Sequence, residues 1–148
     1  KFPICSIEDP FAEEDILSFT KLKKTSPSYL QIVGDDLITT NKENIKFAAE
    51  NNCVNSVLIK PNQIGTITET LEALETSKLY NLDPIMSARS GESEDTTIVD
   101  LCIGLKIAQL KVGSITRSER LAKWNKCLRI GEKLSNKFKM KNNYIFKK

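Results

Sequence analysis

The sequence predicts an α/β fold in which about five strand–helix units form part of a TIM-type (β/α) barrel. Three observations support this prediction. Short apolar segments recur along the chain, each is followed by a stretch with helical character, and charged residues stand where the apolar segments end. This alternation is typical of a parallel sheet whose strands are connected by helices.

The predicted strands are runs rich in Val, Ile and Leu, at residues 2–7, 30–34, 55–60, 84–88 and 109–113. Their first residues are about 25 to 29 positions apart, which is the length of one strand, one helix and two connections. Apolar residues occupy successive positions in these runs, as expected for parallel strands that are covered on both faces.

Two helix starts are predicted from capping boxes, Thr40 with Glu43 and Thr66 with Glu69. In this motif a hydroxyl and a carboxylate three residues later satisfy the first free backbone N–H groups of the helix. Apolar side chains then recur in two stripes that we expect to face the core: Ile67, Leu71 and Leu74, and further on Leu121, Leu128, Ile130 and Leu134.

The composition is that of one soluble globular domain, with 148 residues, 40% hydrophobic and 28% charged. No apolar run approaches the roughly 20 residues that span a bilayer, and residues 1–10 lack the apolar core of a signal peptide. We therefore expect a cytoplasmic protein that does not bind membranes. The widely spaced cysteines predict small buried side chains rather than a disulfide framework or a zinc site: Cys5, Cys53, Cys102 and Cys127.

The charge distribution separates residues 1–136, assigned to the barrel, from a basic tail at residues 137–148. The last sixteen residues hold six lysines, although the net charge of the chain is only +3. Nucleic-acid binding is the alternative for this tail, but the sequence has no recognised motif and few aromatic residues between the lysines. A solvated terminal segment is the favoured interpretation, and we expect no nucleic-acid partner.

All five predicted strands lead into charged side chains at their C-terminal ends: Glu8 and Asp9, Asp35 and Asp36, Lys60, Arg89, and Lys111. In a (β/α) barrel these ends gather on one face, where catalytic groups from different strands converge. The alternative is that each strand simply ends at the surface, but five charged ends in register favour a shared site. Asp9 and Asp36 are expected to cap helices or loops near the rim.

The acidic members of this set predict a metal site. Glu8 and Asp35, on adjacent predicted strands, supply two hard oxygen ligands that suit Mg²⁺. Arg89 and Ser90, beside the flexible Gly91, can hold a phosphate through charge-assisted hydrogen bonds.

The lysines complete the predicted chemistry. Lys60 and Lys111 are expected to face Arg89 and Ser90 from neighbouring strands. A lysine acts as a base only when it is neutral, and nearby cations favour its neutral form. The combination indicates proton abstraction next to a carboxylate, with a metal ion stabilising the enediolate.

Five sequence strings closely resemble the C-terminal half of the enolase family, the phosphopyruvate hydratases of glycolysis: SIEDPF (6–11), VGDDLITTN (33–41), IKPNQIGT (59–66), SARSGESEDT (87–96) and RSERLAKWNKCLRI (117–130). They occur in the family's order and run through nearly the whole chain.

The resemblance implies specific roles. Glu8 and Asp35 look like two of the three carboxylates that bind Mg²⁺, and Lys60 like the base that removes the C2 proton of 2-phosphoglycerate. Arg89 and Ser90 look like phosphate contacts and Lys111 like the partner of the substrate carboxylate. With Glu8, these three form the expected substrate-binding set, and the implied ligands are 2-phosphoglycerate and phosphoenolpyruvate.

Two positions depart from the family pattern. Ala88 stands where the family has a histidine in Ser-His-Arg-Ser-Gly-Glu, and the chain contains no histidine. Pro61 stands where a valine is usual and restricts the backbone at Lys60. These changes resemble a divergent enolase-like protein whose activity is lowered while the metal pair and the base are kept.

With about five units of an eight-stranded barrel, and a start at Lys1 within a predicted strand, we expect a fragment that does not dehydrate 2-phosphoglycerate by itself. The third metal carboxylate, the general-acid glutamates and the lid are expected elsewhere. The parent is expected to be a lyase; the alternatives are a non-catalytic enolase-like protein with a binding or assembly role, and a sugar-acid enzyme, which the Arg89–Ser90 clamp disfavours. An open sheet also predicts self-association, most simply as a two-fold dimer, against a monomer whose terminal segments cover the gap.

Overall fold

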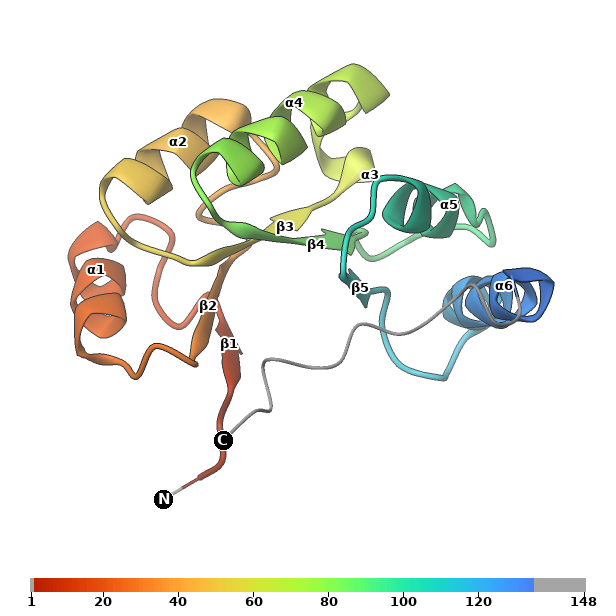
Figure 1. Ribbon diagram of the computed structural model, residues 1–148, viewed down its shortest axis with the longest axis horizontal. Helices are drawn as coiled ribbons and strands as arrows, with labels where there is room; N and C mark the ends of the chain where they lie inside the picture. The colour runs from red at the N-terminus through yellow and green to blue at the C-terminus, as the bar shows by residue number, and fades with distance from the viewer. Residues whose placement is uncertain (1, 135–148) are drawn as a thin grey trace.

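The computed structural model describes residues 2–134 and has one parallel sheet with helices packed against it (Figure 1). The strands are β1 (Ser6–Glu8), β2 (Gln31–Gly34), β3 (Ser56–Ile59), β4 (Asp83–Ser87) and β5 (Gln109–Lys111). The helices are α1 (Ile16–Thr25), α2 (Lys42–Glu50), α3 (Pro61–Ile64), α4 (Ile67–Leu79), α5 (Thr97–Gly104) and α6 (Ser118–Leu134). The predicted α/β class and the strand–helix alternation are confirmed.

The strands pair in chain order, β1-β2-β3-β4-β5, and every pair is parallel. The first strand lies later than predicted, because its pairing with β2 begins only at Ser6 opposite Gln31. The last strand ends earlier than predicted, at Lys111, and Gly113 just beyond it has a φ of 88°, which turns the chain away from an extended path. Because all strand pairs are parallel, the C-terminal ends of the five strands lie at the same end of the sheet, as expected.

Side chains alternate between the two faces of the sheet. Ile32, Val57 and Met86 belong to the main core, which the helices cover. Val33, Leu58 and Ile85, their neighbours in sequence, form a separate small cluster. Strand side chains alternate with a period of two, so this second cluster lies on the opposite face, the one that would face the inside of a barrel.

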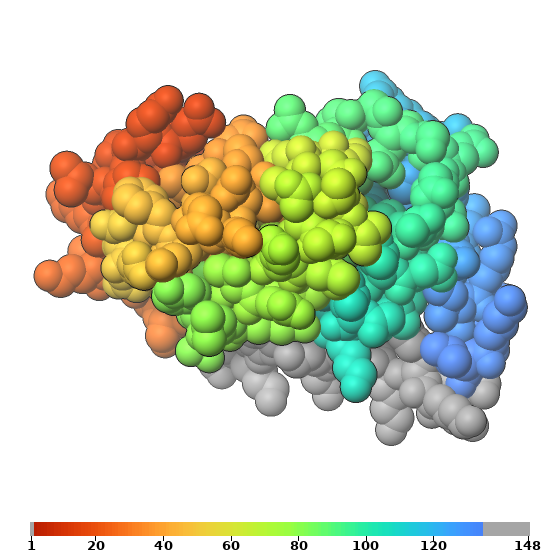
Figure 2. All heavy atoms as spheres, turned by 90° about the horizontal axis from the view of Figure 1, so that it is seen from above, coloured from red at the N-terminus to blue at the C-terminus, as the bar shows by residue number. Residues whose placement is uncertain are grey.

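Helices α2 and α4 lie side by side over the sheet (Figure 2). An ion pair between Lys42 and Glu72, 2.8 Å long, joins them on the surface. Near the far end of the same pair of helices, the Tyr80 hydroxyl donates to the Glu50 carboxylate over 3.2 Å. Of the two helices, α4 packs directly on β3 and β4, and α2 packs beside it.

One of the two predicted capping boxes is confirmed in its hydroxyl half. Thr66 is the N-cap of α4 and its Oγ1 accepts from the Glu69 N–H over 3.1 Å, while the Glu69 carboxylate accepts from the Thr66 hydroxyl rather than from a backbone N–H. The other prediction is wrong, because α2 is capped by Asn41, whose side chain accepts from the N–H of Glu43. Thr40 is fully buried with a φ of 55°, and its hydroxyl oxygen accepts from the N–H of Lys60, just after β3.

The apolar stripe predicted for α6 is mostly wrong. Leu121, Leu128 and Leu134 are exposed, with Leu128 at 66%. The side of α6 that packs against the core carries Trp124, Cys127 and Ile130, together with the buried Lys123. In α4, Leu74 is buried as predicted, whereas Ile67 at the first position is 48% exposed.

Several other predictions can be placed on the structure. Cys53 and Cys102 are buried, as expected, while Cys5 and Cys127 are partly exposed, and all four are free thiols. No helix within residues 2–134 is long and apolar enough to cross a membrane. The predicted basic tail, residues 137–148, lies outside the described residues.

Candidate active site at the C-terminal ends of the strands

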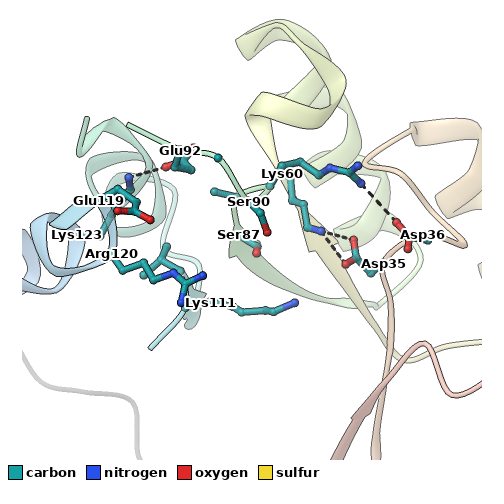
Figure 3. A pocket seen from close by; sticks show the side chains of 15 residues that line it. Asp35, Asp36, Lys60, Ser87, Ser90, Glu92, Lys111, Glu119, Arg120 and Lys123 are labelled. Carbon is teal, nitrogen blue, oxygen red and sulfur yellow. Dashed lines mark hydrogen bonds and ion pairs between the residues drawn. The ribbon is translucent and has the colours of Figure 1, made fainter. Parts of the chain in front are cut away.

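A polar pocket of about 380 Å³ opens at the C-terminal ends of the strands (Figure 3). The loops after β2, β3, β4 and β5 and the first turns of α6 contribute its walls. The lining residues are Asp35, Asp36, Lys60, Ser87, Ala88, Arg89, Ser90, Gly91, Glu92, Lys111, Val112, Gly113, Glu119, Arg120 and Lys123. Four of the predicted strand ends thus meet in one place, whereas Glu8 lies outside the lining.

Lys60 and Asp35 form a buried ion pair in the pocket wall. The Lys60 Nζ lies 2.6 Å from Asp35 Oδ1 and donates to Oδ2 over 2.7 Å, and the two side chains are 6% and 12% exposed. Asp35 Oδ1 has no hydrogen bond among the described residues apart from this ionic contact. The predicted base and one predicted metal ligand are therefore in direct contact.

The backbone around Lys60 is fixed by Thr40. The Lys60 N–H donates to Thr40 Oγ1 over 2.9 Å, and this hydroxyl donates to Gln63 Oε1 over 2.8 Å. Lys60 has an extended conformation, with φ −121° and ψ 100°, and Pro61 opens α3 at its first position. Because a residue before proline prefers this extended conformation, Pro61 is accommodated without strain at Lys60.

Asp9 orients the turn that carries Asp35. Its carboxylate accepts the N–H of Asp35 over 2.9 Å and the N–H of Asp36 over 2.7 Å. Asp9 has a φ of 37°, and this backbone conformation accompanies the two bonds. The expected loop-capping role is confirmed for Asp9, while Asp36 instead lies 3.6 Å from the Arg89 guanidinium.

Lys111 and Glu8 form a second lysine–carboxylate pair. Lys111 Nζ donates to Glu8 Oε1 over 2.6 Å, and the side chains are 47% and 35% exposed. Lys111 belongs to β5 and Glu8 to β1, the two edge strands of the sheet. Lys111 thus reaches Glu8 from the opposite edge of the sheet, a pairing that the sequence did not predict.

The loop after β4 forms another wall of the pocket. The Arg89 N–H donates to Asn62 Oδ1 over 3.0 Å, which ties the loop to α3. The Arg89 and Ser90 side chains both line the pocket, as the phosphate-clamp prediction requires. Ser87 is 1% exposed, and its buried Oγ has no hydrogen-bond partner among the described residues.

Residues from α6 were missed by sequence reasoning. Glu119, Arg120 and Lys123 line the pocket, and Lys123 pairs with Glu92 over 2.6 Å. Arg120 packs across Gly113, where a Cβ would lie 2.7 Å from the Arg120 Cδ. The available signal was a cluster of charges at the start of the helix that follows the last strand, RSERLAK (117–123).

The described residues supply only part of the ligand set that a metal ion needs. Asp35 has a hard buried oxygen without a hydrogen bond, and Glu8 is a second carboxylate at a strand end. Each of them already contacts a lysine ammonium. Within residues 2–134 no group of three or more His, Cys, Asp or Glu side chains could hold a metal together. The donor chemistry suits Mg²⁺, and the number of ligands falls short.

Comparison with known proteins identifies similar sequences. Residues 1–148 match the family described as enolase, C-terminal TIM barrel domain. An enolase of Ehrlichia ruminantium (strain Welgevonden) is 52% identical over 136 residues, which is 92% of this chain and 32% of that protein. An enolase of Pelagibacter ubique (strain HTCC1062) is 51% identical over 140 residues, or 95% of this chain and 33% of that protein.

An enolase of Metamycoplasma arthritidis (strain 158L3-1) is 45% identical over 146 residues, or 99% of this chain and 32% of that protein. The chain thus spans about a third of the length of these curated relatives. The matching domain and the five-stranded curved sheet agree with the predicted partial TIM-type barrel.

Proposed function

Because the chain belongs to the enolase family, we propose that its pocket is part of a site that dehydrates 2-phosphoglycerate to phosphoenolpyruvate. One observation carries this proposal: a buried lysine, Lys60, reaches into a polar pocket that Arg89, Ser90 and Lys111 also line. These groups provide a base, a phosphate clamp and a carboxylate partner in one place. We place the reaction in the cytoplasm, as the composition suggests.

Lys60 is assigned the removal of the C2 proton. In the structure its ammonium donates to Asp35, so Lys60 must lose a proton before it can accept one. A ligand that binds the Asp35 carboxylate would therefore also break the ion pair that holds the Lys60 ammonium. The Thr40 and Gln63 contacts keep the backbone of Lys60 fixed while its side chain exchanges partners.

The charged ligand groups are assigned to the opposite walls. Arg89 is 54% exposed and only loosely paired with Asp36 at 3.6 Å, so its guanidinium is free to bind a phosphate with Ser90. Lys111 is assigned the substrate carboxylate. Glu8, which accepts its hydrogen bond, would orient the Lys111 ammonium and belongs to the substrate-binding set in this way.

Mg²⁺ is part of the proposal, with Asp35 and Glu8 as the residues that would hold it. When bound, it would supply positive charge that stabilises an enediolate. Lys60 contacts both oxygens of Asp35, so Asp35 would have to give up one of these contacts, whereas Glu8 contacts Lys111 through Oε1 and could offer its second oxygen.

Ala88 lines the pocket at the position where the family carries a histidine. Its methyl group can neither donate nor accept a proton, so we expect slow turnover. The alternative is a non-catalytic enolase-like protein with a binding or assembly role. It is supported by Ala88 and by the two lysine–carboxylate pairs, which leave the predicted base and metal ligands satisfied by one another.

A coupled assay of phosphoenolpyruvate formation decides between the two. It uses the longest natural protein in which this sequence occurs, its Lys60→Met variant and its Ala88→His variant. An enzyme should show slow turnover that Lys60→Met abolishes and Ala88→His raises. A binding or assembly protein should be inactive in all three forms.

A further inference from the structure

Lys123 is a buried lysine whose contacts lead to one loop of the pocket. Its side chain is 1% exposed, its Nζ lies 2.6 Å from Glu92 Oε2, and it donates to the Ser93 carbonyl over 2.6 Å. A buried ammonium is unfavourable unless it is paired and hydrogen-bonded. These two contacts therefore tie α6 to the loop between β4 and α5.

Glu92 contacts a second partner, Asn62, on the other side of the loop. Its second oxygen, Oε1, accepts from Asn62 Nδ2 over 3.0 Å. Asn62 Oδ1 in turn accepts the backbone N–H of Arg89 over 3.0 Å. A connected chain of hydrogen bonds thus runs from Lys123 in α6, through the loop, to Asn62 in α3 and back to the residue that begins the predicted phosphate clamp.

The side chain of Arg89 does not hold the loop in place. Within residues 2–134 its one ion pair is with Asp36, 3.6 Å away, and the two side chains are 54% and 59% exposed. Exposed pairs of this kind contribute little. The position of Arg89 is therefore set through its backbone N–H, and hence through Asn62 and Glu92.

We propose that Lys123 is a positioning residue that holds loop residues 89–93 at the rim of the pocket, so that Arg89 and Ser90 face a phosphate-bearing ligand. The ligand class rests on the proposed function. The docking of α6 does not depend on a lysine here, because Trp124, Cys127 and Ile130 pack the helix against the core. All described polar contacts of the Lys123 ammonium go to the loop instead.

Hydrogen exchange of backbone amides in the 148-residue chain, followed by NMR, tests this role. Lys123→Met removes the charge but fills the buried space with an unbranched side chain. The matched control is Lys126→Met, one turn along α6, which removes the more exposed pair with Asp100 at 3.0 Å. In Lys123→Met we expect exchange at residues 89–93 to rise at least about tenfold, with amides of Leu58 and Met86 unchanged. Lys126→Met should leave both groups unchanged.

If Lys123→Met does not fold, Lys123→Gln keeps a buried donor for the Ser93 carbonyl, and a smaller rise confined to the same loop is expected. The positioning role is wrong if the exchange of Leu58 and Met86 rises together with that of the loop, since Lys123 would then stabilise the whole fold. It is also wrong if loop exchange does not change.

Inorganic phosphate provides the second readout, through the amide shifts of Arg89, Ser90 and Gly91. Lys123→Met should raise the dissociation constant at least about fivefold over the unsubstituted chain. Equal affinity in both would contradict the positioning of the clamp. If the unsubstituted chain shows no shift with phosphate while exchange behaves as expected, the proposed function of the pocket fails, and the hold of Lys123 on the loop stands.

Discussion

Lys111 and Glu8 meet across the open sheet: the ammonium of Lys111 lies 2.6 Å from the carboxylate of Glu8, although the residues are 103 positions apart and belong to the two edge strands. In a flat sheet, three intervening strands spaced about 4.8 Å apart would keep these edges out of reach of each other. The contact therefore requires a sheet that curls toward a barrel, and it holds Lys111, which lines the pocket, at the first strand.

The buried pair of Lys60 and Asp35 should contribute strongly to stability. Lys60→Met leaves the Asp35 carboxylate without its ammonium at a site where the side chains are 6% and 12% exposed. We expect the free energy of unfolding, measured by urea titration, to fall by about 3 kcal/mol. The double variant Lys60→Met with Asp35→Asn should regain part of this loss, because no unpaired charge then remains. A loss in the double variant equal to the sum of the two single losses would contradict this coupling.

The rim pair of Lys111 and Glu8 should behave differently. Its side chains are 47% and 35% exposed, so solvent and salt screen the interaction. For Lys111→Met we expect a loss of less than about 1 kcal/mol in the free energy of unfolding, and a smaller loss at high salt. A loss as large as that of Lys60→Met would show that the pair is protected from solvent and that the rim is more closed than its exposure indicates.

The strand ends were predictable because a run of successive apolar residues followed by charge marks where a parallel strand leaves the core. This pattern predicted a shared site, and Asp35, Lys60 and Lys111 line one pocket. The pairing of these charges was not predictable, since it depends on how far the sheet curls. The sequence suggested that nearby cations favour the neutral form of Lys60 and Lys111. In the structure, each of these lysines has a carboxylate as its partner.

Helix boundaries show a second limit of sequence reasoning. Thr40 fits the capping motif by spacing, but its hydroxyl is already engaged by Lys60 and Gln63. Asn41 therefore takes the cap of α2. Competition for one hydroxyl between a local and a distant partner is a tertiary effect that spacing does not reveal. Lys123 was missed for another reason: a lysine on a helix is usually solvated, whereas this one is buried and pairs with Glu92.

Two exposed aspartates should make the thermal stability of the chain depend on pH in the acid range. Hydrogen bonds from Ser18, first from its side chain and then from its backbone, lower the pKa of Asp15 below its usual 3.8. Bonds from the backbone and side chain of Thr97 lower the pKa of Asp95 in the same way. A carboxyl whose pKa is lower in the folded chain stabilises it above the unfolded pKa, and this contribution is lost as pH falls through the folded pKa.

Melting curves of the unsubstituted chain, Asp15→Asn and Asp95→Asn between about pH 7 and about pH 2.5 test this dependence. At neutral pH each variant should melt below the unsubstituted chain, because a neutral amide oxygen accepts these N–H bonds more weakly than a charged carboxylate does. The differences should shrink as the pH falls below 3.8, the usual value for both carboxyls. A difference that persists at the acid end would mean that the carboxyls do not act through their charge.

Mg²⁺ should bind the 148-residue chain only weakly. Asp35 and Glu8 each contact a lysine at 2.6 Å, and the described residues contain no cluster of three ligands. Affinity for Mg²⁺ depends on the number of ligands and on near-octahedral geometry, so a dissociation constant well above micromolar is expected by titration calorimetry. Lys60→Met, which frees Asp35, should bind more tightly than the unsubstituted chain. Micromolar binding that Asp35→Asn leaves intact would place the ion at other residues.

The edges of the sheet should drive self-association of the chain. In residues 2–134, β1 and β5 pair with other strands on one side only, which leaves backbone N–H and C=O groups available along both edges. Exposed apolar side chains flank these edges: Phe2 (74%) and Ile4 (52%) precede β1, and Ile115 (78%) follows β5. The inner cluster of Val33, Leu58 and Ile85 is already buried, so we expect the edges rather than the inner face to meet.

The simplest closed arrangement that satisfies both edges is a two-fold dimer. Light scattering across a dilution series should then give about twice the chain mass of 16.7 kDa at high concentration, and dissociation on dilution. Ile4→Lys, which puts a charge beside the β1 edge, should shift this equilibrium toward the monomer, whereas Leu128→Lys on the outer side of α6 should not. A constant mass near 16.7 kDa at every concentration would exclude the dimer and indicate that the chain covers its own edges.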